Sequence, residues 1–220
     1  MNVLDKELKK AKSIRKEWAK CIIKWEKSQG RKFSWRANRT PYKVLISEIL
    51  LKRTTSTAAL RIYDKFIEKY PDIFTLSKAT YEDLEELIQP IGLYRQRANQ
   101  LKEMAKYFTE DLKGEIPPDY DILIKAPGVG DYTASAVLSF AYHIPKAIVD
   151  SNVERVLKRA FKVKGKKLHE IAEILVPLTE SDIYNYGMLD MGAIVCNYRN
   201  SKCNECLVDT FCLTLLHGEL

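Results

Sequence analysis

The spacing of the apolar residues constrains this chain most, because it is helical almost throughout. In residues 44–70 (VLISEILLKRTTSTAALRIYDKFIEKY) and 81–108 (YEDLEELIQPIGLYRQRANQLKEMAKYF), apolar side chains recur every three or four positions. Strands would instead show strict alternation. With 220 residues, 46% of them hydrophobic, the chain can bury a real core. The sequence therefore predicts an almost purely α-helical fold.

Proline and glycine mark where these helices begin and end. Pro41 follows Thr40 just before an apolar run, a pattern typical of a helix N-terminus. Six further breaks fall between periodic segments: Pro71, Pro90, Gly92, Pro117, Pro118 and Pro127. No stretch is rich enough in Gly, Ser or Pro to form a flexible tether, and no repeat of solenoid period occurs. We therefore expect closely packed helices.

The charge balance favours an anionic partner. The formal net charge is +7 and the sequence pI is about 9.0, which nucleic acid would match most economically. The first residues, MNVLDKELKKAKSIRKEW, are charged and amphipathic and lack the continuous apolar stretch of a signal peptide or membrane span. We expect a cytoplasmic, nucleoid-associated protein without a membrane partner.

Four of the five cysteines lie within the last 25 residues, in the pattern Cys196-x6-Cys203-x2-Cys206-x5-Cys212. The fifth, Cys21, lies in a helical pattern. In a reducing cytosol such clustering favours a metal site over disulfides or unrelated buried thiols. Four thiolates suit either a cubane iron–sulfur cluster or a structural zinc ion. The spacing differs from the paired C-x2-C of zinc ribbons and favours iron–sulfur.

A glycine turn divides two helical segments in residues 126–142 (APGVGDYTASAVLSFAY). Here Pro127-Gly128-Val129-Gly130 precedes a helix that begins near Tyr132. Glycines let the backbone turn tightly and approach a ligand, and a helix N-terminus directs free N–H groups at an anion. A DNA phosphate fits such a site. A purely structural turn is the alternative.

An acidic residue, Asp150, opens the next helical segment, residues 146–159 (KAIVDSNVERVLKR). On the residues alone, a helix N-cap is its simplest role. A catalytic role is compatible with capping.

In combination, these segments resemble the helix-hairpin-helix DNA glycosylases of the endonuclease III and MutY type. The resemblance extends from residues 33–55 (FSWRANRTPYKVLISEILLKRTT) through 91–102, 126–137 and 148–159 to the cysteines. It implies an all-α, two-lobed fold: a six-helix barrel with the hairpin over residues 34–144, and an iron–sulfur cluster domain built from residues 1–33 and 145–220.

The same resemblance implies the ligands. The partner would be double-stranded DNA containing a mismatched or damaged base, bound by a monomer of the protein. Cys196, Cys203, Cys206 and Cys212 would hold one [4Fe–4S] cluster, with Cys21 outside it. The hairpin of Pro127, Gly128, Val129 and Gly130 would grip backbone phosphate, in some relatives with a monovalent cation bound by its carbonyls.

The resemblance also assigns roles at the reaction centre. Such enzymes flip the target nucleotide out of the duplex, and a side chain fills the gap. Lys52 and Arg53 occupy the wedge position, with Arg53 the candidate, although both could simply contact phosphate. Asp150 matches the catalytic aspartate, whose carboxylate would stabilise the positive charge that develops on the sugar.

The residue after the hairpin decides whether strand cleavage follows base removal. An amine there attacks the sugar as a Schiff-base nucleophile. This chain has Tyr132, and Lys125 is a poor substitute because it lies on the other side of the glycine turn. We expect a monofunctional glycosylase with weak or absent lyase activity, while an endonuclease III-like glycosylase and lyase remains an alternative.

The target base is open between two readings. Glu48 matches the glutamate that protonates adenine in MutY-type enzymes, but it also occurs in thymine-removing relatives and could be an ordinary helix glutamate. Burial would raise its pKa; its apolar neighbours are Leu45, Ile46, Ile49, Leu50 and Leu51. The chain stops soon after Cys212, which leaves no room for an 8-oxoguanine-reading domain. We therefore expect removal of thymine or uracil opposite guanine, with adenine removal as the alternative.

Two non-catalytic alternatives remain. A helix-hairpin-helix module can be a passive DNA-binding iron–sulfur accessory, and a four-cysteine domain can be an electron carrier or a zinc-stabilised interaction unit. Asp150, Glu48 and Tyr132 together argue against both.

Overall fold

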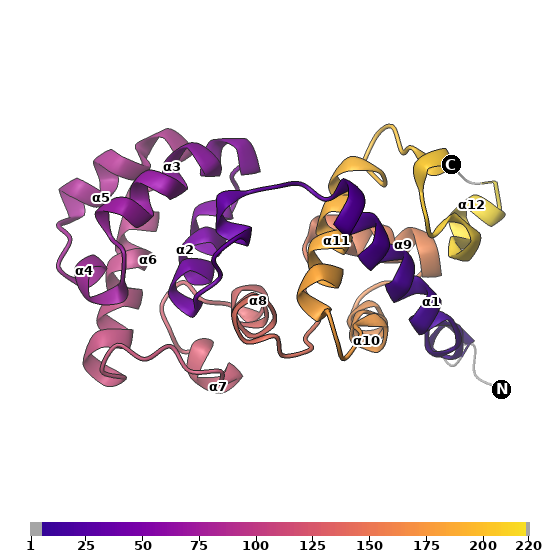
Figure 1. Cartoon of the computed structure of the whole chain (residues 1–220), viewed down its shortest axis with the longest axis horizontal. Helices are drawn as coiled ribbons and strands as arrows, with labels where there is room; N and C mark the ends of the chain where they lie inside the picture. The colour runs from indigo at the N-terminus through magenta and orange to yellow at the C-terminus, as the bar shows by residue number, and fades with distance from the viewer. Residues whose placement is uncertain (1–5, 219–220) are drawn as a thin grey trace. The chain divides into compact units, whose positions relative to one another are not determined.

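A computed structural model describes residues 6–218, which contain helices and loops and no strand. The prediction of an all-α protein is confirmed. The chain divides into two compact units (Figure 1). Residues 32–142 form the first, here called the hairpin unit, and the two chain ends, residues 1–31 and 143–220, form the second, the terminal unit. None of the described helices combines the length and apolar character needed to cross a bilayer.

The hairpin unit is a succession of short helices. They are α2 (Pro41–Leu51), α3 (Ser56–Lys69), α4 (Ile73–Ser77), α5 (Tyr81–Ile88), α6 (Tyr94–Lys106), α7 (Tyr120–Leu123) and α8 (Asp131–Tyr142), with 3-10 turns η2 (Ser34–Arg36) and η3 (Gln89–Ile91) and a π-helical turn η4 (Tyr107–Asp111). Helix α2 begins as predicted, because Thr40 caps it and Pro41 occupies its first turn.

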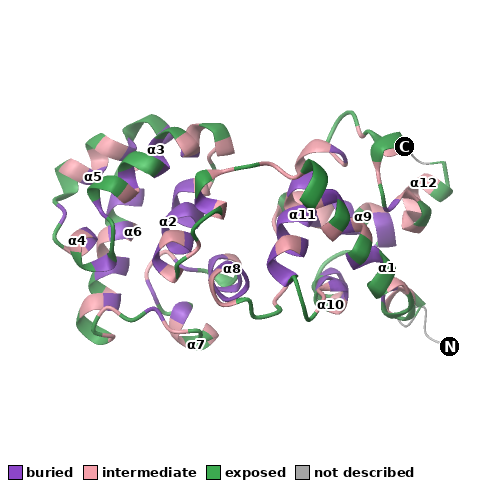
Figure 2. Cartoon of the chain, in the orientation of Figure 1, coloured by how far each residue is buried: buried purple, intermediate pink, exposed green. Residues whose placement is uncertain are grey.

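Helix α2 lies at the centre of this unit's core. Its apolar residues Leu45, Ile46, Ile49 and Leu50 are fully buried (Figure 2), and α2 packs against α3, α6 and α8. The facing helix α8 is rich in small buried residues, including Ala134 and Ala136, which allow the two helices to approach closely. Helix α2 is therefore held in place by the helices of its own unit.

The terminal unit joins the beginning and the end of the chain. It contains α1 (Lys6–Gln29), α9 (Ser151–Phe161), α10 (Lys166–Leu175), α11 (Ser181–Ile194) and α12 (Leu213–Leu216), with 3-10 turns η5 (Cys203–Glu205) and η6 (Asp209–Phe211). Helix α1 packs against α10 and α11. Its Trp18 is fully buried, lies 5.5 Å from the ring of Phe161, and donates a hydrogen bond to the hydroxyl of Tyr184.

A buried ion pair fixes the chain just beyond α1. The carboxylate of Asp190 on α11 is fully buried and accepts from the backbone N–H of Arg31 at 2.7 Å and from its guanidinium at 2.7 and 2.9 Å. The guanidinium binds Oδ1 and the backbone N–H binds Oδ2, so both carboxylate oxygens have donors, which compensates the cost of burying the charge. The N-terminal helix is thus held to a helix that begins 150 residues later in the chain.

Candidate functional site

Two exposed side chains, one in the turn after α2 and one just before α6, have left-handed backbone. Arg53 has a φ of 51° and Leu93, which precedes α6, a φ of 52°. Left-handed backbone is unfavourable for residues other than glycine, and such strain often marks functional sites. Both residues line one hollow of about 310 Å³, which also contacts Lys52, Gln96, Arg97 and Gln100. Sequence reasoning found Arg53 but missed Leu93, whose only signal is its place directly after Gly92.

Arg97 on α6 holds both strained residues in place. Its side chain is buried, and burial lowers its pKa. No carboxylate of the described residues pairs with it; backbone carbonyls surround it instead. Its guanidinium donates to the carbonyls of Ile49, Leu50 (3.1 Å), Lys52 (3.0 Å) and Gly92 (3.4 Å) and to the hydroxyl of Thr54 (3.1 Å). These groups flank Arg53 and precede Leu93.

Glu48 and Lys52 lie one turn apart at the end of α2. Glu48 is buried, with 6% of its surface exposed, among the apolar residues that the sequence indicated. Burial lowers the pKa of Lys52, and the charge of Arg97 lowers it further, while Glu48 opposes the shift. The Lys52 ammonium donates to the carbonyl of Gly128. The end of α2 is therefore tied to the hairpin turn.

The hairpin consists of α7, the glycine turn and α8. Gly128 has a φ of 78°, and a Cβ added there would lie 3.1 Å from the Cβ of Gln100. Gly130 is exposed, and no heavy atom lies within 4 Å of where its Cβ would be. The predicted phosphate contact Val129 is buried, with 6% exposed. Its side chain belongs to the core, so only its backbone can face a ligand.

A hydrogen bond that sequence reasoning missed joins the two hairpin helices. The Tyr120 hydroxyl on α7 donates to the Asp131 carboxylate on α8 at 2.5 Å, and this bond raises the pKa of Tyr120 to about 12. Tyr132 follows in the first turn of α8 and is half-buried. Lys125 is exposed on the other side of the turn. The residue after the hairpin is thus a phenol at a helix N-terminus.

Asp150 caps α9, as its position at the start of a helical segment predicted. Its Oδ1 accepts the backbone N–H groups of Asn152 and Val153 at 2.8 Å each, and its Oδ2 accepts the Asn152 side-chain amide at 2.8 Å. Three donors fix the orientation of this half-buried carboxylate. The capping role is observed; a catalytic role stays a prediction.

Helix α9 also holds the cysteine segment through two arginines. Arg155 donates to the Cys196 carbonyl at 2.7 Å and to the Gly192 carbonyl at 2.6 Å. One turn later, Arg159 donates to the Cys196 thiol at 3.4 Å and to the carbonyl of Asn197 at 2.9 Å. The helix that Asp150 caps is therefore the scaffold of the loop that begins at Cys196.

The four clustered cysteines are half-buried and form no disulfide, and Cys21 lies apart from them on α1. Burial raises the pKa of Cys206 to about 11 and raises that of Cys203, and in both cases the charges of Cys196 and Cys212 add to the shift. The thiols thus lie near enough to influence one another. Within residues 6–218, however, no three His, Cys, Asp or Glu side chains are grouped closely enough to hold a metal ion. The cluster stays a prediction.

The candidate residues divide between the two units. Glu48, Lys52, Arg53, the hairpin turn and Tyr132 belong to the hairpin unit, whereas Asp150 and the four cysteines belong to the terminal unit. Within the first, Lys52 and Arg97 bring the wedge position and the hairpin together. Within the second, α9 brings the capped aspartate and the cysteine segment together.

A helical hairpin with a glycine turn defines a helix-hairpin-helix protein. In the same unit the exposed Arg53 is held by Arg97 and the carbonyls that Arg97 binds, here called the clamp. Residues 46–190 match the family described as "HhH-GPD superfamily base excision DNA repair protein". The chain belongs to this superfamily, and the assignment made from its motifs is confirmed.

Individual relatives agree with that assignment. The chain is 38% identical over 205 residues to a thymine/uracil-DNA glycosylase of Methanothermobacter thermautotrophicus, covering 90% of this chain and 93% of the relative. It is 34% identical to an adenine DNA glycosylase of Buchnera aphidicola, covering 90% of this chain but 58% of that relative. The solved structure of a thermostable thymine-DNA glycosylase matches with a TM-score of 0.89 at 36% identity, over 93% of this chain and 98% of that one.

The clamp can be tested by Arg97→Lys, which keeps the charge but cannot reach carbonyls on both sides of Arg53. Leaving buried carbonyls without donors should lower the free energy of unfolding by about 2 kcal/mol, measured by urea denaturation. Arg95→Lys is the matched control, because Arg95 lies on the same helix with 80% of its side chain exposed; its effect should stay within about 0.5 kcal/mol. Equal effects of the two substitutions would contradict the clamp.

Proposed function

We propose that this protein is a monofunctional DNA glycosylase of base excision repair, which hydrolyses the N-glycosidic bond of thymine or uracil mismatched with guanine. The observation that carries the proposal is the likeness to thymine-removing glycosylases across nearly the full length of both chains. The adenine-removing relative is less similar and extends well beyond the matched region. Acting on genomic DNA would place the protein at the nucleoid.

The hairpin unit supplies groups for gripping and opening the duplex. The first N–H groups of α8 have no intrahelical acceptors and can bind a backbone phosphate, which can approach closely because Gly130 has no side chain. Arg53 and Leu93 project from the same hollow. One charged and one apolar side chain, both pre-positioned by Arg97, suit the filling of a gap left by a flipped nucleotide.

Asp150 supplies the carboxylate for bond cleavage. As the glycosidic bond breaks, positive charge develops on the sugar, and a fixed negative group stabilises it without reorganising. The three hydrogen bonds to Asp150 provide that fixed orientation. The carboxylate can also orient the attacking water. Because Tyr132 has no amine, no Schiff base forms at that position and the reaction ends with base removal.

Adenine removal is the second candidate, and the burial of Glu48 favours it. A carboxyl group with 6% of its surface exposed among apolar residues is suited to protonate a leaving base. The same residue would be compatible with thymine release, so substrate preference has to separate the two.

We also propose that Cys196, Cys203, Cys206 and Cys212 hold one [4Fe–4S] cluster that organises the loop after α11. The donor set fits, since four free thiols lie in one segment that Arg155 and Arg159 hold against α9. Arginines beside thiolates also suit the net negative charge of a thiolate-bound cluster. A monovalent cation at the hairpin would use carbonyls other than that of Gly128, which the Lys52 ammonium already contacts.

A panel of duplexes containing T·G, U·G, A·G and A·8-oxoguanine, each scored with and without alkali, tests the substrate. We expect faster release from T·G and U·G at one fixed salt concentration, since salt alone changes the affinity for any duplex.

Asp150→Asn should retain duplex binding and lower excision at least about a hundredfold. Asparagine also caps helices, but its amide nitrogen would face the Asn152 amide that donates to Oδ2, so the free energy of unfolding should fall by about 1 kcal/mol.

Asp72→Asn is the matched control, since Asp72 caps α4 in the hairpin unit; it should leave excision unchanged. Normal excision by Asp150→Asn would leave Asp150 as a cap alone. Adenine release with inert T·G would instead make Glu48 the essential acid.

Tyr132→Lys should add strand cleavage to base removal. A lysine amine in the first turn of α8 can form a Schiff base, and the helix dipole there favours its neutral, reactive form. Borohydride should trap a covalent protein–DNA adduct with this variant and only faintly with the parent. Tyr132→Met controls for loss of the ring, which should lower excision without trapping. Equal trapping by the parent would point to another amine, such as Lys52 or Lys125, and contradict the monofunctional assignment.

Metal analysis of anaerobically prepared protein tests the cluster. We expect about four iron atoms per chain and a yellow-brown colour. Cys203→Ser should lose iron and lower the melting temperature, because ligand binding contributes to folding. Cys21→Ser, outside the segment, should retain both. One zinc per chain without iron would overturn the assignment.

A further inference from the structure

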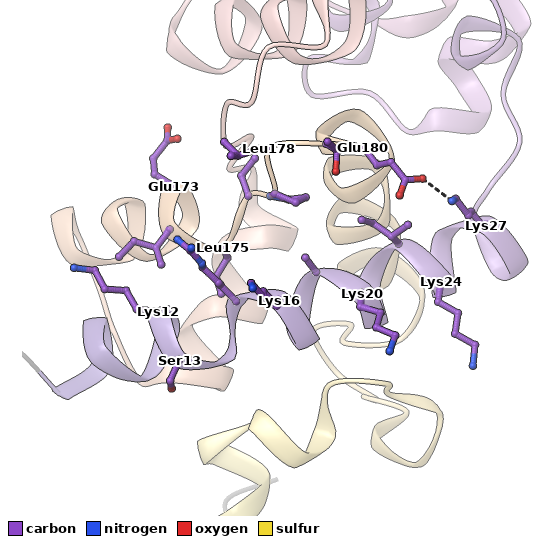
Figure 3. A pocket seen from close by; sticks show the side chains of 17 residues that line it. Lys12, Ser13, Lys16, Lys20, Lys24, Lys27, Glu173, Leu175, Leu178 and Glu180 are labelled. Carbon is purple, nitrogen blue, oxygen red and sulfur yellow. Dashed lines mark hydrogen bonds and ion pairs between the residues drawn. The ribbon is translucent and has the colours of Figure 1, made fainter.

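A groove in the terminal unit is not used by the proposed reaction. It has a volume of about 1260 Å³ and lies between α1 and the segment that leads from the end of α10 to the start of α11 (Figure 3). Every residue that lines it belongs to the terminal unit. The groove is separate from the hollow beside Arg53 and from the cysteine segment.

One wall of the groove is a row of cations on α1. Lys12, Lys16, Lys20 and Lys24 follow one another at intervals of four residues along about 18 Å of the helix, and in Figure 3 Lys20 and Lys24 point away from Leu178. All four are exposed, and none forms an ion pair or side-chain hydrogen bond with a described residue. Arg15 adds a fifth unpaired cation. Among the described residues, no carboxylate forms an ion pair with these five cations, so the row carries a positive potential.

The two carboxylates in the groove do not change this balance. Glu180 pairs with Lys27 at 2.5 Å, and Glu173 pairs with Lys146 at 3.0 Å. Both are already engaged by cations outside the row.

The other wall is apolar and only partly buried. Ile174, Val176, Pro177 and Leu178 line it, and Ile23 of α1 also lines the groove. Leu178 has 86% of its surface exposed, the largest value among the exposed large hydrophobic residues of the described chain. Leu178 adjoins the half-buried Ile174, Val176 and Pro177, so the wall is a contiguous apolar patch rather than an isolated side chain, and such patches mark binding sites.

We propose that this groove binds an acidic amphipathic helix of a partner protein. Carboxylates spaced four residues apart on such a helix would match the axial spacing of the lysines, about 6 Å per step. Apolar residues on the adjoining stripe would cover Leu178 and Pro177, as in other helix-in-groove complexes. A nucleic acid could use the lysines but would leave the apolar wall uncovered. The inference stands apart from the proposed glycosylase function.

Titration of fluorescent peptides against the full-length protein tests the proposal. The probe is a peptide of about four helical turns, with glutamate at every fourth position and leucine on the adjoining stripe. A scrambled peptide of the same composition keeps its charge and loses the amphipathic face. We expect the ordered peptide to bind about tenfold more tightly than the scrambled one, with salt weakening both.

Two different substitutions separate the charge from the apolar contact. Lys16→Glu with Lys20→Glu should weaken binding of the ordered peptide about tenfold or more, and Leu178→Ser should remove most of its advantage over the scrambled peptide. Lys65→Glu together with Arg61→Glu, an equal charge change on exposed residues of α3, should have no effect. All variants should keep the parent's melting temperature and excision of T·G.

Equal affinity for the ordered and scrambled peptides would overturn the proposal, as would insensitivity to Leu178→Ser. An undamaged DNA duplex that displaces the peptide, and loses affinity in the Lys16→Glu, Lys20→Glu variant, would assign the groove to nucleic acid instead. The last outcome concerns vesicles of anionic phospholipid. If the parent bound them more tightly than that variant did, and neither protein bound the peptide, the groove would be assigned to a membrane surface.

Discussion

A buried arginine surrounded by carbonyls, with no carboxylate partner among the described residues, determines the geometry of the hairpin unit. Helix α2 is buried on nearly all sides, so the last carbonyls of this helix need donors within the protein. The planar guanidinium of Arg97 can satisfy several acceptors at once, and a cation at a helix C-terminus is favoured by the dipole. The guanidinium also donates to the carbonyls of Lys52 and Gly92, which directly precede the left-handed residues Arg53 and Leu93.

In the terminal unit, α9 positions both the candidate carboxylate and the cysteine segment. Its first turn is fixed by the Asp150 cap, and its outer face binds the cysteine segment through Arg155 and Arg159. The close approach of α11 completes the arrangement: a Cβ on Gly192 would lie 2.8 Å from the Cβ of Asn152 and 2.9 Å from its carbonyl oxygen. Because Asn152 also donates to Asp150, any displacement at this contact would reach the carboxylate. The proposed reaction and the cysteine loop thus depend on one helix.

Features with local causes could be predicted from the sequence, and features with distant causes could not. The Thr40-Pro41 start of α2, the glycine turn at 127–130 and the Asp150 cap each depend on residues within a few positions. The break between α2 and α3 falls inside a stretch of continuous helical spacing, which does not indicate it. At this break the carbonyl of Lys52 accepts a hydrogen bond from an arginine 45 residues away. The left-handed conformation of Leu93 likewise lies next to a distant contact of Arg97, with the carbonyl of Gly92, and could not be predicted. The burial of the Val129 side chain also depends on packing that the motif does not show. The family could be identified from the sequence motifs, whereas the contacts of Arg97 could be identified only from the structure.

The net charge illustrates the same distinction. A charge of +7 suggests one electrostatic footprint for DNA, since composition cannot say where the cations lie. In the structure, however, five cations without an ion pair among the described residues line a groove on α1 that also exposes Leu178, whereas the hairpin offers the backbone N–H groups of α8, a glycine without a side chain and the nearby Arg53. Phosphate requires charge and hydrogen bonds but gains nothing from leucine. The exposed positive charge of this chain therefore lies on two surfaces of different chemistry, and the proposed base excision uses only one of them.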